Sequence, residues 1–181
     1  MLVGTKVRLR AIEPADYPLL ATWLNDPEIM VYWGRPGNSV SLAEVARDEE
    51  RQAARGTSRK YMIETFDALA IGQIDYYDLD LQARSTSVSI MIGNPEFLGG
   101  GYGSDAMRTL LGYLFRQVGL HRVALNVHRS NERALHSYRK NGFVEEGIMR
   151  DWAFFDGHWV DGILMSVLAT DFENITAART T

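Results

Sequence analysis

Four glycines lie close together in the middle of the chain, at Gly99, Gly100, Gly101 and Gly103. They separate a β-branched run that ends at Ile92 from an amphipathic segment that extends to about Val118, so a strand is expected to pass into a helix here. Glycine accepts positive φ and lets a ligand approach backbone N–H groups. A helix N-terminus adds unpaired amides and the positive end of a dipole. The stretch therefore predicts a pyrophosphate cradle.

A second group of polar residues accompanies the next expected helix. Asn131 is placed to cap this helix, and Tyr138 follows seven residues later, two turns along the same face. A phenol held close to a leaving group can donate a proton to it, whereas a tyrosine in an apolar stripe with Ala134 and Leu135 can equally be a core residue. The neighbourhood is basic, which suits phosphate groups or a solvated helix face, through His128, Arg129, Arg133, Arg139 and Lys140.

Three carboxylates form an acidic cluster further upstream, at Asp75, Asp78 and Asp80. They could attract a cationic substrate, although a solvated loop is the simpler interpretation.

The four histidines show no metal-site spacing, and the absence of cysteine excludes a thiolate zinc site and a disulfide framework. No metal site is predicted.

The composition is that of a soluble globular protein, with 46% hydrophobic and 23% charged residues among 181. The net charge of −4 argues against a nucleic-acid partner. No apolar run is long enough to span a membrane, and the N-terminus has no signal-peptide pattern. We therefore expect a cytoplasmic protein, with a single domain over residues 1–173 and a flexible tail over 174–181.

Periodicity and turn signals predict an order of β-α-α-β-β-β-α-β-α-β-β. The expected strands cover residues 7–10, 60–66, 70–77, 85–92, 122–127, 143–155 and 158–168. Two hairpins are expected, with turns at 67–69 and at Asp156-Gly157. A capping box formed by Ser41 and Glu44 is expected to open a polar helix that runs to Arg55. This order indicates a mixed sheet with helices on its faces.

Several of these segments resemble the GNAT superfamily of N-acetyltransferases. The resemblance rests on Pro95-Glu96-Phe97-Leu98-Gly99-Gly100-Gly101-Tyr102-Gly103, Asn131-Glu132-Arg133-Ala134 and Tyr138-Arg139-Lys140-Asn141-Gly142-Phe143. The early segment 25–30 and the closing pattern from Glu146 to Asp161 are similar to the branch that holds ribosomal-protein N-terminal acetyltransferases and spermidine acetyltransferases. The resemblance covers nearly the whole chain. It implies an α/β (α+β) fold with a mixed, mostly antiparallel sheet, helices on both faces, and a splay between the fourth and fifth strands.

The resemblance also implies a reaction and a set of site residues. Acetyl-CoA would be the co-substrate, and a primary amine would attack it directly, the amine being a protein N-terminal α-amine or a polyamine-like small molecule. Tyr138 would protonate the leaving thiolate, and Glu28 would lie near the acceptor as a base or amine ligand. A strand end with exposed amides, the glycine loop and the following helix would bind the cofactor through Met91, Ile92, Gly93, Leu98, Gly99, Gly100, Gly101, Tyr102, Gly103, Ser104, Asn131 and Arg133. A homodimer through the C-terminal strands is also implied.

Two positions depart from the family pattern, and two other functions stay open. Leu98 stands where the family usually has Gln or Arg, and Gly100 where it usually has Lys, which leaves backbone amides as the main contacts with the pyrophosphate. A non-catalytic CoA-binding domain on the same fold is one alternative. The other is an NADP-binding oxidoreductase, because Gly101-x-Gly103-x-x-Ala106 matches a dinucleotide fingerprint, although His128-Arg129 replaces the acid expected at the next strand end.

Overall fold

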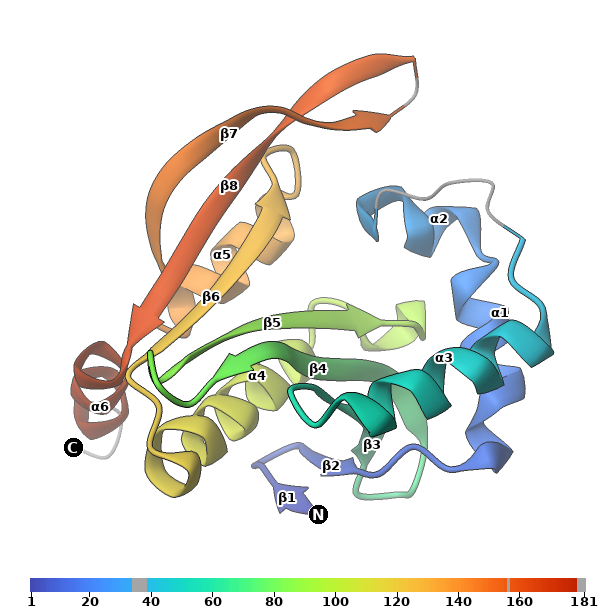
Figure 1. The fold of residues 1–181 in the computed structure, drawn as a ribbon, viewed down its shortest axis with the longest axis horizontal. Coiled ribbons are helices and arrows are strands. Elements are labelled where there is room, and N and C mark those ends of the chain that lie inside the picture. The colour runs from blue at the N-terminus through green and yellow to red at the C-terminus, as the bar shows by residue number, and fades with distance from the viewer. Residues whose placement is uncertain (34–38, 156, 179–181) are drawn as a thin grey trace.

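An eight-stranded sheet organises the chain in the computed structural model, which describes residues 1–33, 39–155 and 157–178 (Figure 1). The strands lie in the order β1-β2-β3-β4-β5-β6-β8-β7. Their bounds are β1 Leu2–Val3, β2 Val7–Arg10, β3 Arg59–Thr65, β4 Ala70–Asp80, β5 Ser85–Ile92, β6 Arg122–His128, β7 Val144–Phe155 and β8 His158–Leu168.

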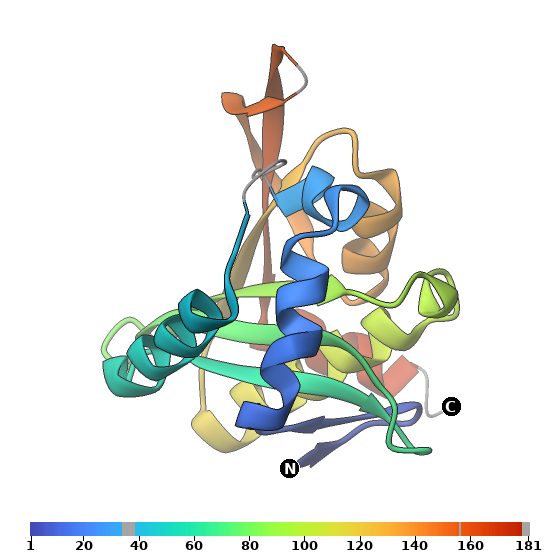
Figure 2. The same cartoon turned by 90° about the vertical axis from the view of Figure 1, so that its right-hand side faces the viewer.

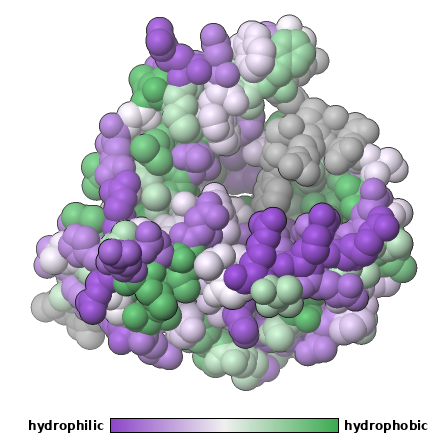
Figure 3. Space-filling model, viewed as in Figure 1, coloured by the Kyte–Doolittle hydropathy of each residue, from purple (hydrophilic) through white to green (hydrophobic). Residues whose placement is uncertain are grey.

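The helices cover both faces of this sheet. Short helices occupy Pro14–Asp16, Val31–Trp33 and Pro95–Phe97, and a π-helical turn, Leu114–Val118, extends α4. The α-helices are α1 Tyr17–Leu24, α2 Pro27–Met30, α3 Leu42–Arg55, α4 Tyr102–Tyr113, α5 Glu132–Lys140 and α6 Ala169–Ala178. Figure 2 shows α1 and α3 lying across the sheet, with the distal part of the β7–β8 hairpin projecting beyond the other strands. The surface over α3 is hydrophilic (Figure 3), as its polar sequence predicts.

Local signals set many of the element boundaries. The predicted capping box is present, because Ser41 Oγ accepts from the Glu44 amide and the Glu44 carboxylate accepts from the Ser41 amide. Both expected hairpins form, as β3 pairs with β4 and β7 with β8. In the second turn Gly157 has a φ of 78°, while Asp156 lies outside the described residues. Asn131 caps α5 as predicted, its side chain accepting from the Ala134 amide at 3.1 Å.

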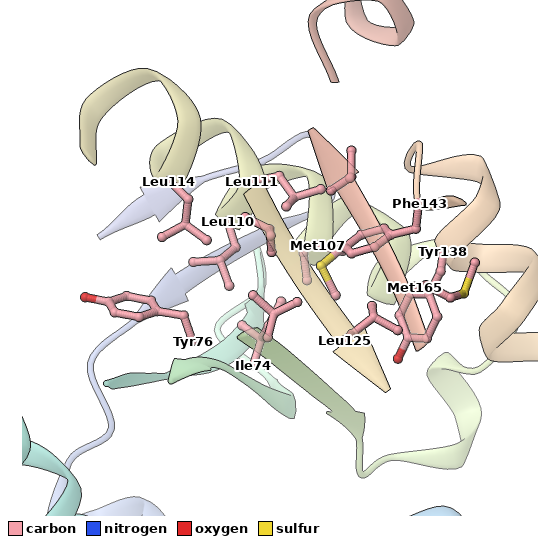
Figure 4. Packing of buried hydrophobic residues seen from close by; sticks show 14 of the residues in the cluster. Ile74, Tyr76, Met107, Leu110, Leu111, Leu114, Leu125, Tyr138, Phe143 and Met165 are labelled. Atoms are coloured by element: carbon pink, nitrogen blue, oxygen red, sulfur yellow. The ribbon is translucent and has the colours of Figure 1, made fainter. Parts of the chain in front are cut away.

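Alternation along the strands separates two cores. On β3, Ile63 joins a large cluster beneath α4, whereas the neighbouring Met62 joins a smaller cluster beneath α1 and α3. The large cluster continues into the β6–β8 half of the sheet and reaches Tyr138 on α5 (Figure 4). The apolar stripe of α4, including Met107 and Leu110, is fully buried there. These two cores hold the sheet rigid on both sides of its middle strands.

The sheet opens between β5 and β6. All other strand pairs are antiparallel, but β5 and β6 are parallel and pair only from Ser85–Ser87 with Arg122–Ala124. Beyond these residues β5 and β6 diverge, so the end of β5 at Ile92 and the end of β6 at His128 do not pair with each other. The structure adds the short strand β1 before the first predicted strand, so the fourth and fifth predicted strands are β5 and β6. The splay predicted between them is confirmed.

Asp105 fastens the first turn of α4 to the N-terminal strands. Its carboxylate accepts from the backbone amides of Thr5 (3.2 Å), Lys6 (2.7 Å) and Val7 (3.2 Å), and from the Thr5 hydroxyl (2.7 Å). The Asp105 side chain is almost fully buried. A single carboxylate therefore fixes how the glycine loop, which precedes α4, is placed against the sheet edge.

The C-terminal segment differs from the sequence expectation. Residues 174–178, expected to belong to a flexible tail, continue helix α6, and Phe172 of this helix packs beside Phe115 at 5.3 Å between ring centroids. Arg116 also forms an ion pair with Glu173 at 2.9 Å. The apolar and ionic contacts with the end of α4 stabilise a helix whose own sequence is small and polar. None of the described helices is long and apolar enough to cross a membrane.

Candidate active site

A cleft of about 860 Å³ occupies the splay between β5 and β6. Its walls come from α2, the ends of β5 and β6, the glycine loop, α5 and β7. The space-filling view shows the surface hollowed between the β7–β8 hairpin and α3 (Figure 3). The cleft is lined by most of the expected site residues, namely Glu28, Met91, Ile92, Leu98, Gly99, Gly101, Gly103, Ser104, Asn131, Arg133 and Tyr138.

The glycine loop has the conformation that the sequence predicts for an anion cradle. Gly99 and Gly101 have φ values of 78° and 82°, and Gly101 is the N-cap of α4. The unpaired amides of the first helical turn therefore begin directly at the cleft. Gly100 and Tyr102 do not line the cleft but shape the loop, because the Lys6 ammonium donates to the Gly100 carbonyl at 2.8 Å and lies over the Tyr102 ring. This geometry fits the pyrophosphate of a CoA thioester.

Replacing Gly101 by Ala is expected to weaken acetyl-CoA binding about tenfold. A left-handed conformation costs a residue with a Cβ about 1–2 kcal/mol, so the variant would favour other loop conformations. Isothermal titration with acetyl-CoA measures the effect. Gly56→Ala is the matched control, because Gly56 also has positive φ (67°) but ends α3 away from the cleft. Equal affinities for wild type and Gly101→Ala would contradict the assignment of this loop.

Tyr138 projects from α5 toward the ends of β5 and β6 (Figure 4). The side chain is 9% exposed, and burial, followed by the nearby Tyr77, raises its pKa to about 12. The phenol is therefore protonated at neutral pH and can act only as a proton donor. Asn141, at the end of the same helix, donates to Ser104 Oγ of α4 at 2.9 Å. This hydrogen bond links the helix that carries Tyr138 to the helix that begins at the glycine loop.

The opposite end of the cleft is aromatic and acidic. His128 contacts Trp152 and Tyr32 edge-on, with ring centroids 5.1 Å and 6.2 Å apart, so three separate elements meet there. Burial lowers the pKa of His128, which favours the neutral imidazole. Asp26, the N-cap of α2, and Glu28 within α2 line this end, and Glu28 is exposed.

Gly93 does not take the position expected for it. Its N–H donates to the Ile71 carbonyl at 2.9 Å, and a Cβ built on it would lie 2.1 Å from the Trp23 ring. Gly93 is absent from the cleft wall, which corrects the expectation that its amide is exposed to a thioester. The glycine instead allows α1 to pack closely on the end of β5. The register between β4 and β5 shifts between Tyr77 and Asp80, which lie opposite the start of β5, whereas Gly93 follows the end of β5.

Ser89 and Tyr77 are among the wall residues that were not singled out from the sequence. Behind Ser89 lies Asp75, which is buried in β4 and does not belong to a solvated loop, whereas Asp78 and Asp80 are exposed. The acidic cluster is therefore split by the structure. One sequence signal was available, because Asp75 interrupts the otherwise apolar and aromatic run Ile74-Asp75-Tyr76.

Comparisons with known proteins agree with this geometry. The family model of the acetyltransferase (GNAT) domain matches residues 6–144. Spermidine N(1)-acetyltransferase of Vibrio cholerae is 27% identical over 95% of this chain and 98% of its own. The Bacillus subtilis protein YdaF, provisionally named a ribosomal N-acetyltransferase, is 32% identical over 94% of this chain and 96% of its own.

A solved structure is similar over nearly the whole fold. The crystal structure of spermidine N-acetyltransferase from Vibrio cholerae in complex with CoA and spermine superposes with a TM-score of 0.87, covering 94% of this chain and all of that chain at 27% identity. The fold, the acetyltransferase activity and the use of acetyl-CoA, all expected from the sequence, are confirmed. The chain belongs to the GNAT family of acetyltransferases.

Proposed function

We propose that this acetyltransferase transfers the acetyl group of acetyl-CoA to a primary amine of a polyamine. The charge distribution along the cleft carries the proposal. Arg133, His136 and Lys140 line the side formed by α5, near the glycine loop, whereas Asp26 and Glu28 line the acceptor end with Tyr32 and Trp152. Carboxylates and aromatic faces attract ammonium groups. A substrate with several cationic nitrogens would use these groups better than a peptide with one α-amine.

The proposed reaction is a direct transfer. The neutral amine nitrogen attacks the thioester carbonyl carbon, the C–S bond breaks, and the Tyr138 hydroxyl gives its proton to the departing thiolate. The nitrogen loses one proton as the amide forms, and this proton restores the Tyr138 hydroxyl. Asn131 and Arg133 at the start of α5, with the loop amides at Gly99, Gly101 and Gly103, hold the CoA portion. Glu28 orients the cationic acceptor. Support for these roles comes from the positions of the residues in one cleft and from the relatives named as spermidine acetyltransferases.

The acceptor can be identified by following thiol release from acetyl-CoA with spermidine, butylamine and a short peptide that has a free α-amine. We expect kcat/KM for spermidine to exceed that for butylamine at least about tenfold, because a second ammonium ion interacts with the acidic end of the cleft. Glu28→Gln should raise KM for spermidine several-fold and leave the rate with butylamine nearly unchanged.

Two other outcomes would have different meanings. A peptide that reacts faster than spermidine would assign the acceptor site to protein N-termini. Binding of acetyl-CoA without thiol release in the presence of any amine would contradict catalysis and favour the CoA-binding domain.

Homodimer formation through the C-terminal strands stays a prediction, which sedimentation of the purified protein would test.

A further inference from the structure

A row of polar side chains crosses three neighbouring strands of the sheet. Lys60 on β3 is the register partner of Asp75 on β4, and Asp75 is the register partner of Ser89 on β5. Partners in adjacent antiparallel strands present their side chains on the same face. The Ser89 hydroxyl donates a hydrogen bond to Asp75 Oδ1. The row therefore extends from β3, under α3, to the wall of the cleft, where Ser89 lies.

Asp75 is an unusual residue for this position. It is 7% exposed, and burial raises its pKa to about 6, while the hydrogen bond from Ser89 and the charge of Lys60 act in the opposite direction. The Lys60 ammonium lies 2.5 Å from Glu49 and 3.6 Å from Asp48, both on α3, and these two carboxylates also raise the pKa of Asp75. The carboxyl group thus has a basicity suited to accept a proton near neutral pH.

The row also approaches the proton donor on the far side of the cleft. Tyr77, two residues after Asp75 on β4, lines the cleft, and burial, followed by the charge of Asp75, raises the pKa of Tyr77. Burial also raises the pKa of Tyr138, and the nearby Tyr77 adds to that shift. Ser89 and Tyr138 both line this cleft, Ser89 from β5 and Tyr138 from α5. A proton acceptor and a proton donor are therefore arranged on opposite walls of the space between β5 and α5.

We propose that Ser89 and Asp75 form a relay that removes a proton from the acceptor amine, a role that rests on the proposed transfer to an amine. The ammonium group gives a proton to Ser89 Oγ as the Ser89 hydroxyl proton passes to Asp75 Oδ1. An ammonium ion and a carboxylate become a neutral amine and a carboxylic acid, and no bond to carbon changes in this step. Ser89 touches the amine, and Asp75 acts through Ser89 as a positioning residue and proton acceptor.

The relay is tested by the pH dependence of spermidine acetylation, measured by thiol release between about pH 5 and about pH 9. For wild type, we expect kcat/KM to fall as pH decreases through the pKa of Asp75, which is about 6. Asp75→Asn should remove this acidic limb and lower kcat/KM at least about tenfold near neutral pH. Ser89→Ala should lose activity to a similar extent, and Ser89→Thr, which restores a hydroxyl, should recover it.

Three further measurements separate a relay from a structural role. Acetyl-CoA affinity and the melting temperature of Asp75→Asn should not fall, and Asp78→Asn, an exposed position on the same strand, should behave as wild type. Loss of acetyl-CoA binding by Asp75→Asn would overturn the relay, as would an unchanged acidic limb or a fully active Ser89→Ala. Absence of turnover by wild type with every amine would instead overturn the proposed function, and the relay with it.

Discussion

Tyr138→Phe is expected to bind acetyl-CoA as wild type does and to lose at least about tenfold in turnover. The substitution removes one oxygen atom from a buried ring that packs against Phe143, with ring centroids 5.7 Å apart, so the core around it keeps its shape. The departing thiolate would then have to take its proton from water. The loss should appear in kcat, because the phenol contributes as the C–S bond breaks and contributes little to binding before that.

Single-turnover thiol release and titration with acetyl-CoA measure the two quantities separately. Tyr61→Phe is the matched control, because Tyr61 is also buried with a pKa raised to about 12, yet it lies on β3 outside the cleft. This variant should keep full turnover. If Tyr138→Phe turned over as fast as Tyr61→Phe, Tyr138 would be a core residue and another group would protonate the thiolate.

Asp105→Ala is expected to destabilise the protein by about 3 kcal/mol or more. Its carboxylate accepts hydrogen bonds from three consecutive backbone amides and one hydroxyl, and the alanine variant would leave these donors without that partner in a partly buried place. Urea unfolding should show a lower midpoint with an unchanged m value. Asp105→Asn keeps one acceptor oxygen and should lose less.

The same variant should also bind acetyl-CoA more weakly. The Lys6 amide donates to the Asp105 carboxylate, and the Lys6 ammonium donates to the Gly100 carbonyl of the glycine loop. A loss of stability below about 1 kcal/mol for Asp105→Ala would show that the N-terminal strands are held by the apolar core alone.

The sequence was most informative where structure depends on neighbouring residues. Glycine spacing, the Asp-Gly turn and the caps at Ser41 and Asn131 are local signals, because each reports what the backbone can do within a few residues. These signals placed the loop, the hairpins and the helix that carries Tyr138. The family motifs supplied the mostly antiparallel pairing and the splay, which no local pattern contains.

The sequence was least informative for side chains whose partners are far along the chain. Asp105 reads as an ordinary acid in a first helical turn, although its partners are about 100 residues earlier. Asp75 reads as part of a solvated cluster until the register with Ser89 is known. Gly93 reads as a free strand end until Trp23 packs over it. In each case tertiary contacts decide the role, and the segment itself does not identify the partner residues.

The buried carboxyl group of Asp75 lowers the stability of the fold, although the proposed relay needs it for catalysis. The pKa of Asp75 is about 6 in the folded chain, compared with an ordinary value of 3.8. The protonated side chain therefore contributes its full share to the stability of the fold below pH 3.8, and this contribution is lost as pH rises through about 6. Near neutral pH the native state therefore carries a cost of about 3 kcal/mol for the ionised group. Selection for heat resistance alone would replace Asp75 by a neutral residue, whereas selection for acetyl transfer would retain it. A redesign guided only by melting temperature would remove the group on which proton removal depends.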